Sequence, residues 1–134
     1  MKNSKVFLGG TCNGSTWRDE VIKGLRIEYF NPVVPDWTPE CQAEEERQKS
    51  ELCNIHLYVI TPKMTGVFSI AEAVQSSNDK TKKTYFCYLE EDEGATFSAH
   101  QVKSLKATAG LIEKNGGKSY TCINDLIKGL NEER

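Results

Sequence analysis

The chain has 134 residues, of which 38% are hydrophobic and 27% are charged, and its formal net charge is −2. This composition is typical of one globular domain, here spanning residues 1–134, and not of a disordered protein. Acidic and basic residues are interspersed without the basic face that nucleic-acid polymers require, and no apolar run is long enough for a signal peptide or a membrane span. We therefore expect a cytoplasmic protein that binds neither nucleic-acid polymers nor membranes.

Hydrophobic periodicity predicts strands and helices that alternate along the chain. In chain order the expected elements are a strand at 5–8, a helix at 17–25, a strand at 26–30, a helix from 38–39 through 49, a strand at 55–61, a helix at 69–78, a strand at 84–89, a helix at 98–114, a strand at 119–122 and a helix at 123–130. The charged residues of 44–49 are interpreted as a solvated helix face, and the acidic segment 90–94 as a solvated loop.

This alternation predicts an α/β fold, a three-layer sandwich with a parallel five-stranded sheet and helices on both faces. Right-handed crossovers make a flavodoxin-like or Rossmann-like arrangement the expected closure. In such sheets the loops that follow the strands meet at the carboxyl edge, where helix N-termini offer free backbone donors. The segments after the first three strands are therefore the expected ligand-binding loops.

The first of these loops contains Gly9, Gly10 and Thr11, which let a ligand approach the backbone and offer it a hydroxyl group. Its sequence is neither a dinucleotide-binding fingerprint nor a P-loop. Cys12 is a minor candidate nucleophile, and Trp17 either stacks on a flat ligand or covers the core. The five cysteines include no Cys-x-x-Cys pair, which argues against a structural zinc site, and we expect neither a metal nor another cofactor.

The second loop holds Asn31, Asp36 and Trp37. Asp36 either contacts a ligand or is a turn residue, and the Trp37 indole either stacks on a ligand or covers the core. The third loop leads to Ser69 and Glu72, which share one face of a helix because they lie one turn apart. Glu72 is either a catalytic carboxylate at the sheet edge or an exposed glutamate favoured by the helix dipole.

Three segments together resemble the nucleoside 2-deoxyribosyltransferase-like proteins. They are FLGGT at 7–11 with STWR at 15–18, NPVVPDW at 31–37, and GVFSIAE at 66–72. The resemblance implies a flavodoxin-like fold and a double displacement at the anomeric carbon of a deoxyribonucleoside. It also implies that the ligand is a small-molecule nucleoside or nucleotide, and that the protein is a homodimer or a higher homo-oligomer.

The resemblance also implies roles for individual residues. The family's nucleophile is a glutamate near the start of the helix after the third strand, which corresponds to Glu72, with Ser69 in the supporting position. Asp36 is the candidate for holding or protonating the leaving base, and Asn31 is a further polar contact. Trp37, together with Trp17, is expected to line the pocket.

Two positions differ from the pattern of well-characterised transferases. Val74 stands where a glycine is usual, and the segment 62–65 lacks the usual acidic residue that contacts the base. Lys63 in that segment either favours a phosphorylated substrate and hydrolysis or points to solvent. The expected function is cleavage or transfer of an N-glycosidic bond. The alternatives are a non-catalytic module that binds a nucleotide or sugar phosphate, and a structural protein with a vestigial pocket.

Overall fold

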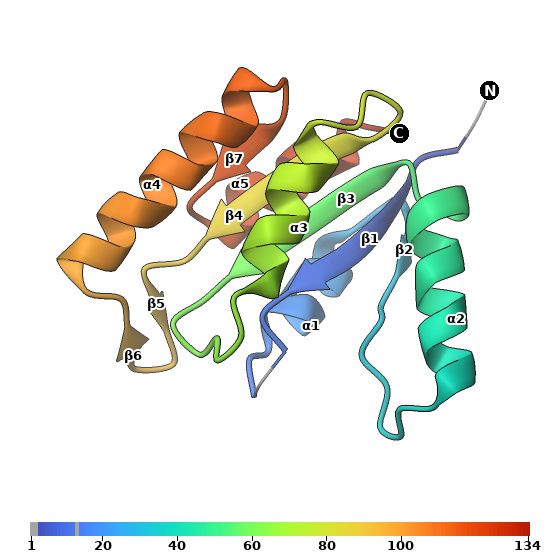
Figure 1. The fold of residues 1–134 in the computed structure, drawn as a ribbon, viewed down its shortest axis with the longest axis horizontal. Coiled ribbons are helices and arrows are strands. Elements are labelled where there is room, and N and C mark those ends of the chain that lie inside the picture. Colours follow the sequence, from blue (N-terminus) through green and yellow to red (C-terminus); the bar gives the residue numbers. More distant parts are fainter. Residues whose placement is uncertain (1–2, 13) are drawn as a thin grey trace.

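The computed structural model describes residues 3–12 and 14–134, and this part of the chain forms a five-stranded parallel sheet in the order β2-β1-β3-β4-β7 (Figure 1). The strands are β1 (Lys5–Gly10), β2 (Glu28–Phe30), β3 (Ile55–Ile60), β4 (Lys83–Tyr88) and β7 (Lys118–Tyr120). The helices are α1 (Trp17–Gly24), α2 (Pro39–Arg47), η1 (Gln48–Leu52), α3 (Phe68–Ser77), α4 (Ala99–Lys114) and α5 (Ile123–Asn131). The predicted α/β sandwich of flavodoxin-like or Rossmann-like type is confirmed.

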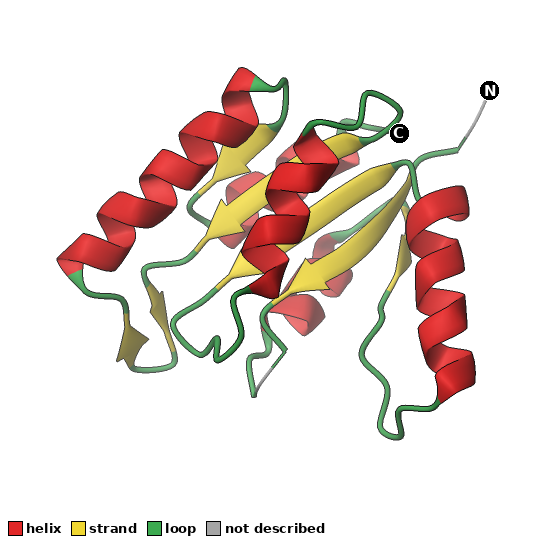
Figure 2. Cartoon of the chain, viewed as in Figure 1, coloured by secondary structure: helices red, strands yellow, loops and turns green. Residues whose placement is uncertain are grey.

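Helices cover both faces of the sheet (Figure 2). α3 and α4 lie on one face and α1 and α5 on the other, while α2 lies near the β2 edge (Figure 1). Each face has its own apolar core, one around Leu57 and Leu126 and the other around Tyr58 and Ile112. The central strand β3 is buried at every position, as a parallel strand covered on both faces must be. Among the described residues, no helix has the length and apolar character needed to cross a membrane.

β1 is two residues longer than predicted, so Gly9 and Gly10 belong to the strand and not to the loop after it. Gly9 pairs with Tyr58 and Gly10 with Val59 in the neighbouring strand β3. Gly10 has a φ of 122°, and a Cβ atom there would lie 2.1 Å from the carbonyl oxygen of Val59. Only glycine fits this position, because the backbone conformation and the close strand both exclude a side chain.

The two edge strands are shorter than predicted, and residues that flank them form other contacts. The backbone N–H of Arg26, before β2, donates to Oδ1 of Asn131 in α5 at 2.8 Å. After β7, the Sγ atom of Cys122 accepts from the backbone N–H of Asp125 at 3.4 Å and caps α5. Both edge strands of the sheet have only three residues.

Segment 90–94 is largely exposed, as predicted, but it is part of a hairpin and not a plain loop. β5 (Glu91–Asp92) and β6 (Ala95–Thr96) pair as an antiparallel hairpin. Its two turn residues, Glu93 and Gly94, have φ angles of 50° and 90°. Positive φ at both central residues is typical of the tight turn whose twist matches that of the flanking strands.

α2 continues directly into η1, a turn of π-helix that the periodicity did not predict. The backbone N–H of Cys53 donates to the carbonyl of Gln48 at 2.7 Å, which spans five residues instead of the four of an α-helix. Such turns inserted into α-helices are frequent at functional sites. This one carries Lys49 at its second position.

Candidate active site

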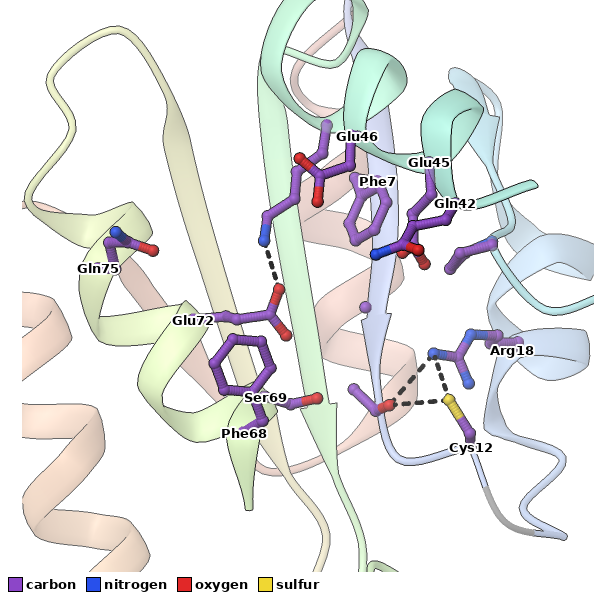
Figure 3. Close-up of a pocket in the computed structure, with 14 residues that line it drawn as sticks. Phe7, Cys12, Arg18, Gln42, Glu45, Glu46, Phe68, Ser69, Glu72 and Gln75 are labelled. Carbon is purple, nitrogen blue, oxygen red and sulfur yellow. Dashed lines mark hydrogen bonds and ion pairs between the residues drawn. The ribbon is translucent and has the colours of Figure 1, made fainter. Parts of the chain in front are cut away.

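A cleft of about 470 Å³ opens between α2 and α3, over the carboxyl end of β1 (Figure 3). This volume is within the range of small-molecule sites. The cleft lies at the point where the strand order reverses, since β1 has β2 on one side and β3 on the other. Of the residues expected at a site, Gly9 and Gly10 line its floor, and Ser69 and Glu72 line its α3 wall.

Glu72 lies in the second turn of α3, and its side chain is 19% exposed. Its carboxylate forms an ion pair with the ammonium group of Lys49, which reaches across from the α2 side (Figure 3). Ser69 lies one turn before Glu72 on the same side of α3. The ion pair therefore joins the two walls and holds the carboxylate in the cleft.

The α2 side of the cleft is polar. Its lining residues are Gln42, Glu45, Glu46 and Lys49. These positions follow i, i+3, i+4 and i+7 spacing, so they share one face of the helix. The interpretation of 44–49 as a solvated face holds for Glu44 and Arg47, which pair with each other at 2.9 Å on the exposed side. It is wrong for the face that looks toward the sheet.

Glu45 is an ionisable residue of the cleft that sequence reasoning missed. Burial, followed by the negative charge of Glu72, raises the pKa of Glu45 above its usual value. A carboxyl group with a raised pKa is suited to the role of a proton donor. The signal in the sequence was the spacing of Glu45 from Gln42 and Lys49.

His56, a second residue without a predicted role at the site, fixes the backbone of Lys49. Its Nε2 donates to the carbonyl oxygen of Lys49 at 2.7 Å, because a carbonyl can only accept. Nδ1 is then free to accept from the hydroxyl of Ser76, 3.0 Å away, and Ser76 is in turn 2.7 Å from the hydroxyl of Thr84. Burial lowers the pKa of His56 to about 4, so the ring is neutral at pH 7.

The loop after β1 is held by the buried guanidinium of Arg18. It donates to the carbonyl oxygens of Leu8 at 3.0 Å, Gly10 at 3.3 Å and Thr11 at 2.6 Å. The Sγ atom of Cys12 lies 3.8 Å from the same group, and both side chains line the cleft (Figure 3). The carboxyl end of β1 is thereby fixed by side-chain donors as well as by its strand partners.

Thr11 and Trp17, two candidate ligand contacts, are both buried, and for Trp17 this agrees with the alternative in which it covers the core. Trp17 is 2% exposed, and its Nε1–H donates to the carbonyl oxygen of Thr11 at 2.8 Å. The hydroxyl of Thr11 accepts from the backbone N–H of Thr61 at 3.0 Å. In the described part of the chain neither residue lines the cleft, and both hold the loop against the core.

The loop 31–37 contributes Pro32 to the cleft, whereas Asn31, Asp36 and Trp37 are not among its described lining residues. Oδ1 of Asn31 accepts from the backbone N–H of Val33 at 3.1 Å, and Trp37 is 61% exposed. The loop follows the edge strand β2, so it extends away from the sheet before it returns in α2 (Figure 1). A role for Asp36 or Trp37 in ligand binding therefore requires this loop to move toward the cleft.

Lys63 in the third loop is neither free in solvent nor part of the described lining of the cleft. It pairs with Glu93 of the β5–β6 turn and donates to the carbonyl oxygen of Gly14 at 3.2 Å. The hydroxyl of Ser15 donates to Asp92 at 2.7 Å. These contacts join the loops after β1 and β3 to the hairpin.

Among residues 3–12 and 14–134, no group of three or more His, Cys, Asp or Glu side chains is placed to hold a metal ion. A family model described as nucleoside 2-deoxyribosyltransferase like matches residues 3–91, which is more than half of the chain. The matched residues include β1, α2, β3 and α3, and so both walls of the cleft. A comparison with curated proteins finds no significant match. The chain belongs to the nucleoside 2-deoxyribosyltransferase-like family.

Proposed function

We propose that the protein cleaves or transfers the N-glycosidic bond of a nucleoside or nucleotide, with Glu72 as the nucleophile. The observation that carries this proposal is the Glu72 carboxylate in the cleft, on the helix that follows β3 and in ion pair with Lys49. Membership of the nucleoside 2-deoxyribosyltransferase-like family supports glycosyl transfer as the type of chemistry. The cleft has room for a ligand of nucleoside size.

The proposed reaction has two displacement steps. A carboxylate oxygen of Glu72 attacks the anomeric carbon, the bond from that carbon to the base nitrogen breaks, and its electron pair leaves with the base. In the second step a nitrogen of an incoming base, or a water oxygen, attacks the same carbon and releases Glu72. A base as acceptor gives transfer and water gives hydrolysis.

The leaving base must be protonated, and Glu45 is our candidate for the donor. Its raised pKa favours the protonated form, and it lines the wall opposite Glu72. Asp36, with Asn31 and Trp37, is proposed to contact the base only after the loop 31–37 has moved over the cleft. Lys49 offsets the charge of Glu72 in the free protein and must give up part of that contact when the sugar enters.

The alternative is a non-catalytic module that binds a nucleotide or sugar phosphate in the same cleft. The Lys49–Glu72 pair favours it, because the carboxylate is already neutralised by a neighbouring cation. Such a module would be stabilised thermally by its ligand without forming a product. Measuring both the melting temperature and the product in the same samples therefore distinguishes the binding module from the enzyme.

The test is product analysis by liquid chromatography and mass spectrometry. The protein is incubated with nucleosides, deoxynucleotides and NAD, with and without free adenine or cytosine. Glu72→Gln is expected to lower turnover at least about a thousandfold, because it removes the nucleophile and keeps the shape of the side chain. Glu44→Gln is the matched control, since Glu44 pairs with Arg47 outside the cleft and should keep full turnover. Wild-type turnover in Glu72→Gln would contradict the proposed nucleophile.

We also propose that the protein is a homodimer or a larger homo-oligomer. Val67 and Phe68, at the start of α3, are 69% and 74% exposed beside the cleft-lining Ser69. Large exposed apolar side chains at the mouth of a site are typical of surfaces that contact another chain. Light scattering coupled to gel filtration measures the mass, and a monomer at every concentration would contradict this proposal.

A further inference from the structure

Tyr58 in β3 has a buried hydroxyl group that no other described part of the protein satisfies. The residue is fully buried, and its hydroxyl is without a hydrogen-bond partner among the residues that the structure describes. Buried polar groups in native proteins are nearly always paired, because an unpaired group loses its bonds to water without replacing them. A persistent exception therefore calls for a functional explanation.

The packing of this hydroxyl does not explain its presence. Tyr58 pairs in register with Phe86 of β4, and both rings belong to the same apolar cluster under α3 and α4. Phe86, the neighbour of Tyr58 in the next strand, thus has the same ring without the hydroxyl. Phenylalanine at position 58 would fill the core and leave no polar atom unpaired.

The ring of Tyr58 lies against the backbone of a residue that lines the cleft. Gly9, which lines that floor, is its partner across the strands. A Cβ atom at Gly9 would lie 2.8 Å from Cδ1 and from Cε1 of the Tyr58 ring. The missing side chain at Gly9 is therefore what makes room for this ring beside the lining of the cleft.

The charges of two carboxyl groups of the cleft act on this hydroxyl. Burial raises the pKa of Tyr58, and the negative charges of Glu72 and then Glu45 raise it further. The phenol therefore keeps its proton at neutral pH and can act only as a donor toward a carboxylate. Glu72 has the larger effect, and only its Oε2 atom is engaged by Lys49.

We propose that Tyr58 is a positioning residue whose hydroxyl donates a hydrogen bond to Glu72 when substrate enters the cleft. This inference rests on the proposed function. As the sugar enters beside the carboxylate, Glu72 gives up part of its contact with Lys49 and turns toward the hydroxyl of Tyr58. The bond fixes the direction of the attacking oxygen, and no proton is transferred. The free protein keeps the hydroxyl unpaired so that the donor is in place for the loaded state.

Tyr58→Phe tests this inference, because it removes the hydroxyl and keeps the ring. We expect kcat/KM of this variant to be about tenfold lower than that of the wild type, which corresponds to the loss of one hydrogen bond to a charged group. The acid limb of the pH profile of kcat moves to higher pH, because in the enzyme–substrate complex the ionised carboxylate loses a donor that favours it. The Tm of this variant stays equal to that of the wild type or rises, because an unpaired buried hydroxyl has been removed.

Tyr85→Phe is the matched control. Tyr85 is also a buried strand tyrosine, but it lies on the opposite face of the sheet, and its hydroxyl donates to Glu133 and lies 3.1 Å from the carbonyl oxygen of Gly129. This variant is expected to have a lower Tm and an unchanged kcat/KM and pH profile.

Two results would overturn the role of Tyr58 while the proposed function stands. One is a Tyr58→Phe variant with wild-type kcat/KM and pH profile. The other is a parallel loss of Tm and activity without a shift of the acid limb, which would show a purely structural role. Absence of turnover by the wild type on every substrate would instead overturn the proposed function, and this inference with it.

Discussion

His56→Gln is expected to make the stability of the fold less sensitive to acid. Burial lowers the pKa of His56 from 6.5 to about 4 in the folded protein, whereas the unfolded chain has the ordinary value. Between these two values the unfolded state binds a proton that the folded state does not, so the free energy of unfolding falls as the pH falls. From pH 7.5 to pH 4.5 this single group lowers it by about 2.5 kcal/mol. The effect is absent above pH 7.5 and complete below about pH 4.

The assay is urea unfolding followed by circular dichroism at both pH values. Glutamine is chosen because its amide can still donate toward the carbonyl of Lys49 but takes up no proton. Between pH 7.5 and pH 4.5 the free energy of unfolding of the wild type should fall by about 2.5 kcal/mol more than that of His56→Gln. His100→Gln, which changes an exposed residue of α4, should behave as the wild type does. An equal loss in the wild type and in His56→Gln would refute the buried, neutral imidazole and its hold on Lys49.

Two further predictions concern the strand ends and the thiols. Gly10→Ala should lower the free energy of unfolding by at least about 3 kcal/mol, because its Cβ would collide with the backbone of Val59; wild-type stability in a urea titration would contradict this. Burial raises the pKa of Cys53 to about 11 and that of Cys87 to about 12, so at pH 8 both should react with a thiol reagent only after unfolding. The exposed Cys12 and Cys122 should react in the native protein, and mass spectrometry of labelled peptides distinguishes them; labelling of Cys53 as fast as Cys122 would contradict the burial.

The sheet could be predicted from the sequence because its central strands are buried on both faces. The run at Ile55–Ile60 is apolar or aromatic at nearly every position. A short run of this kind between two predicted helices is typical of a buried parallel strand. The hairpin at 91–96 could not be predicted, since strands of two residues have no periodicity and its turn needs a positive φ at Glu93, an unusual residue for it. The π-turn after Arg47 also has no signature in hydrophobic spacing, because it depends on one wide hydrogen bond.

The sequence predicts the site residues of one wall of the cleft, on α3, better than those of the other wall, on α2 and the turn after it. Glu72 stands out because it is the single carboxylate in an otherwise apolar helix start. α2 offers no such contrast, since it is polar on all sides, and none of its residues is fully buried. Yet a helix of that composition cannot be held against a sheet by apolar burial alone, so the face that turns inward must find polar partners. Lys49 finds its partner in the carboxylate of Glu72, and Glu45 lines the cleft, which is why this helix and the turn after it belong to the site.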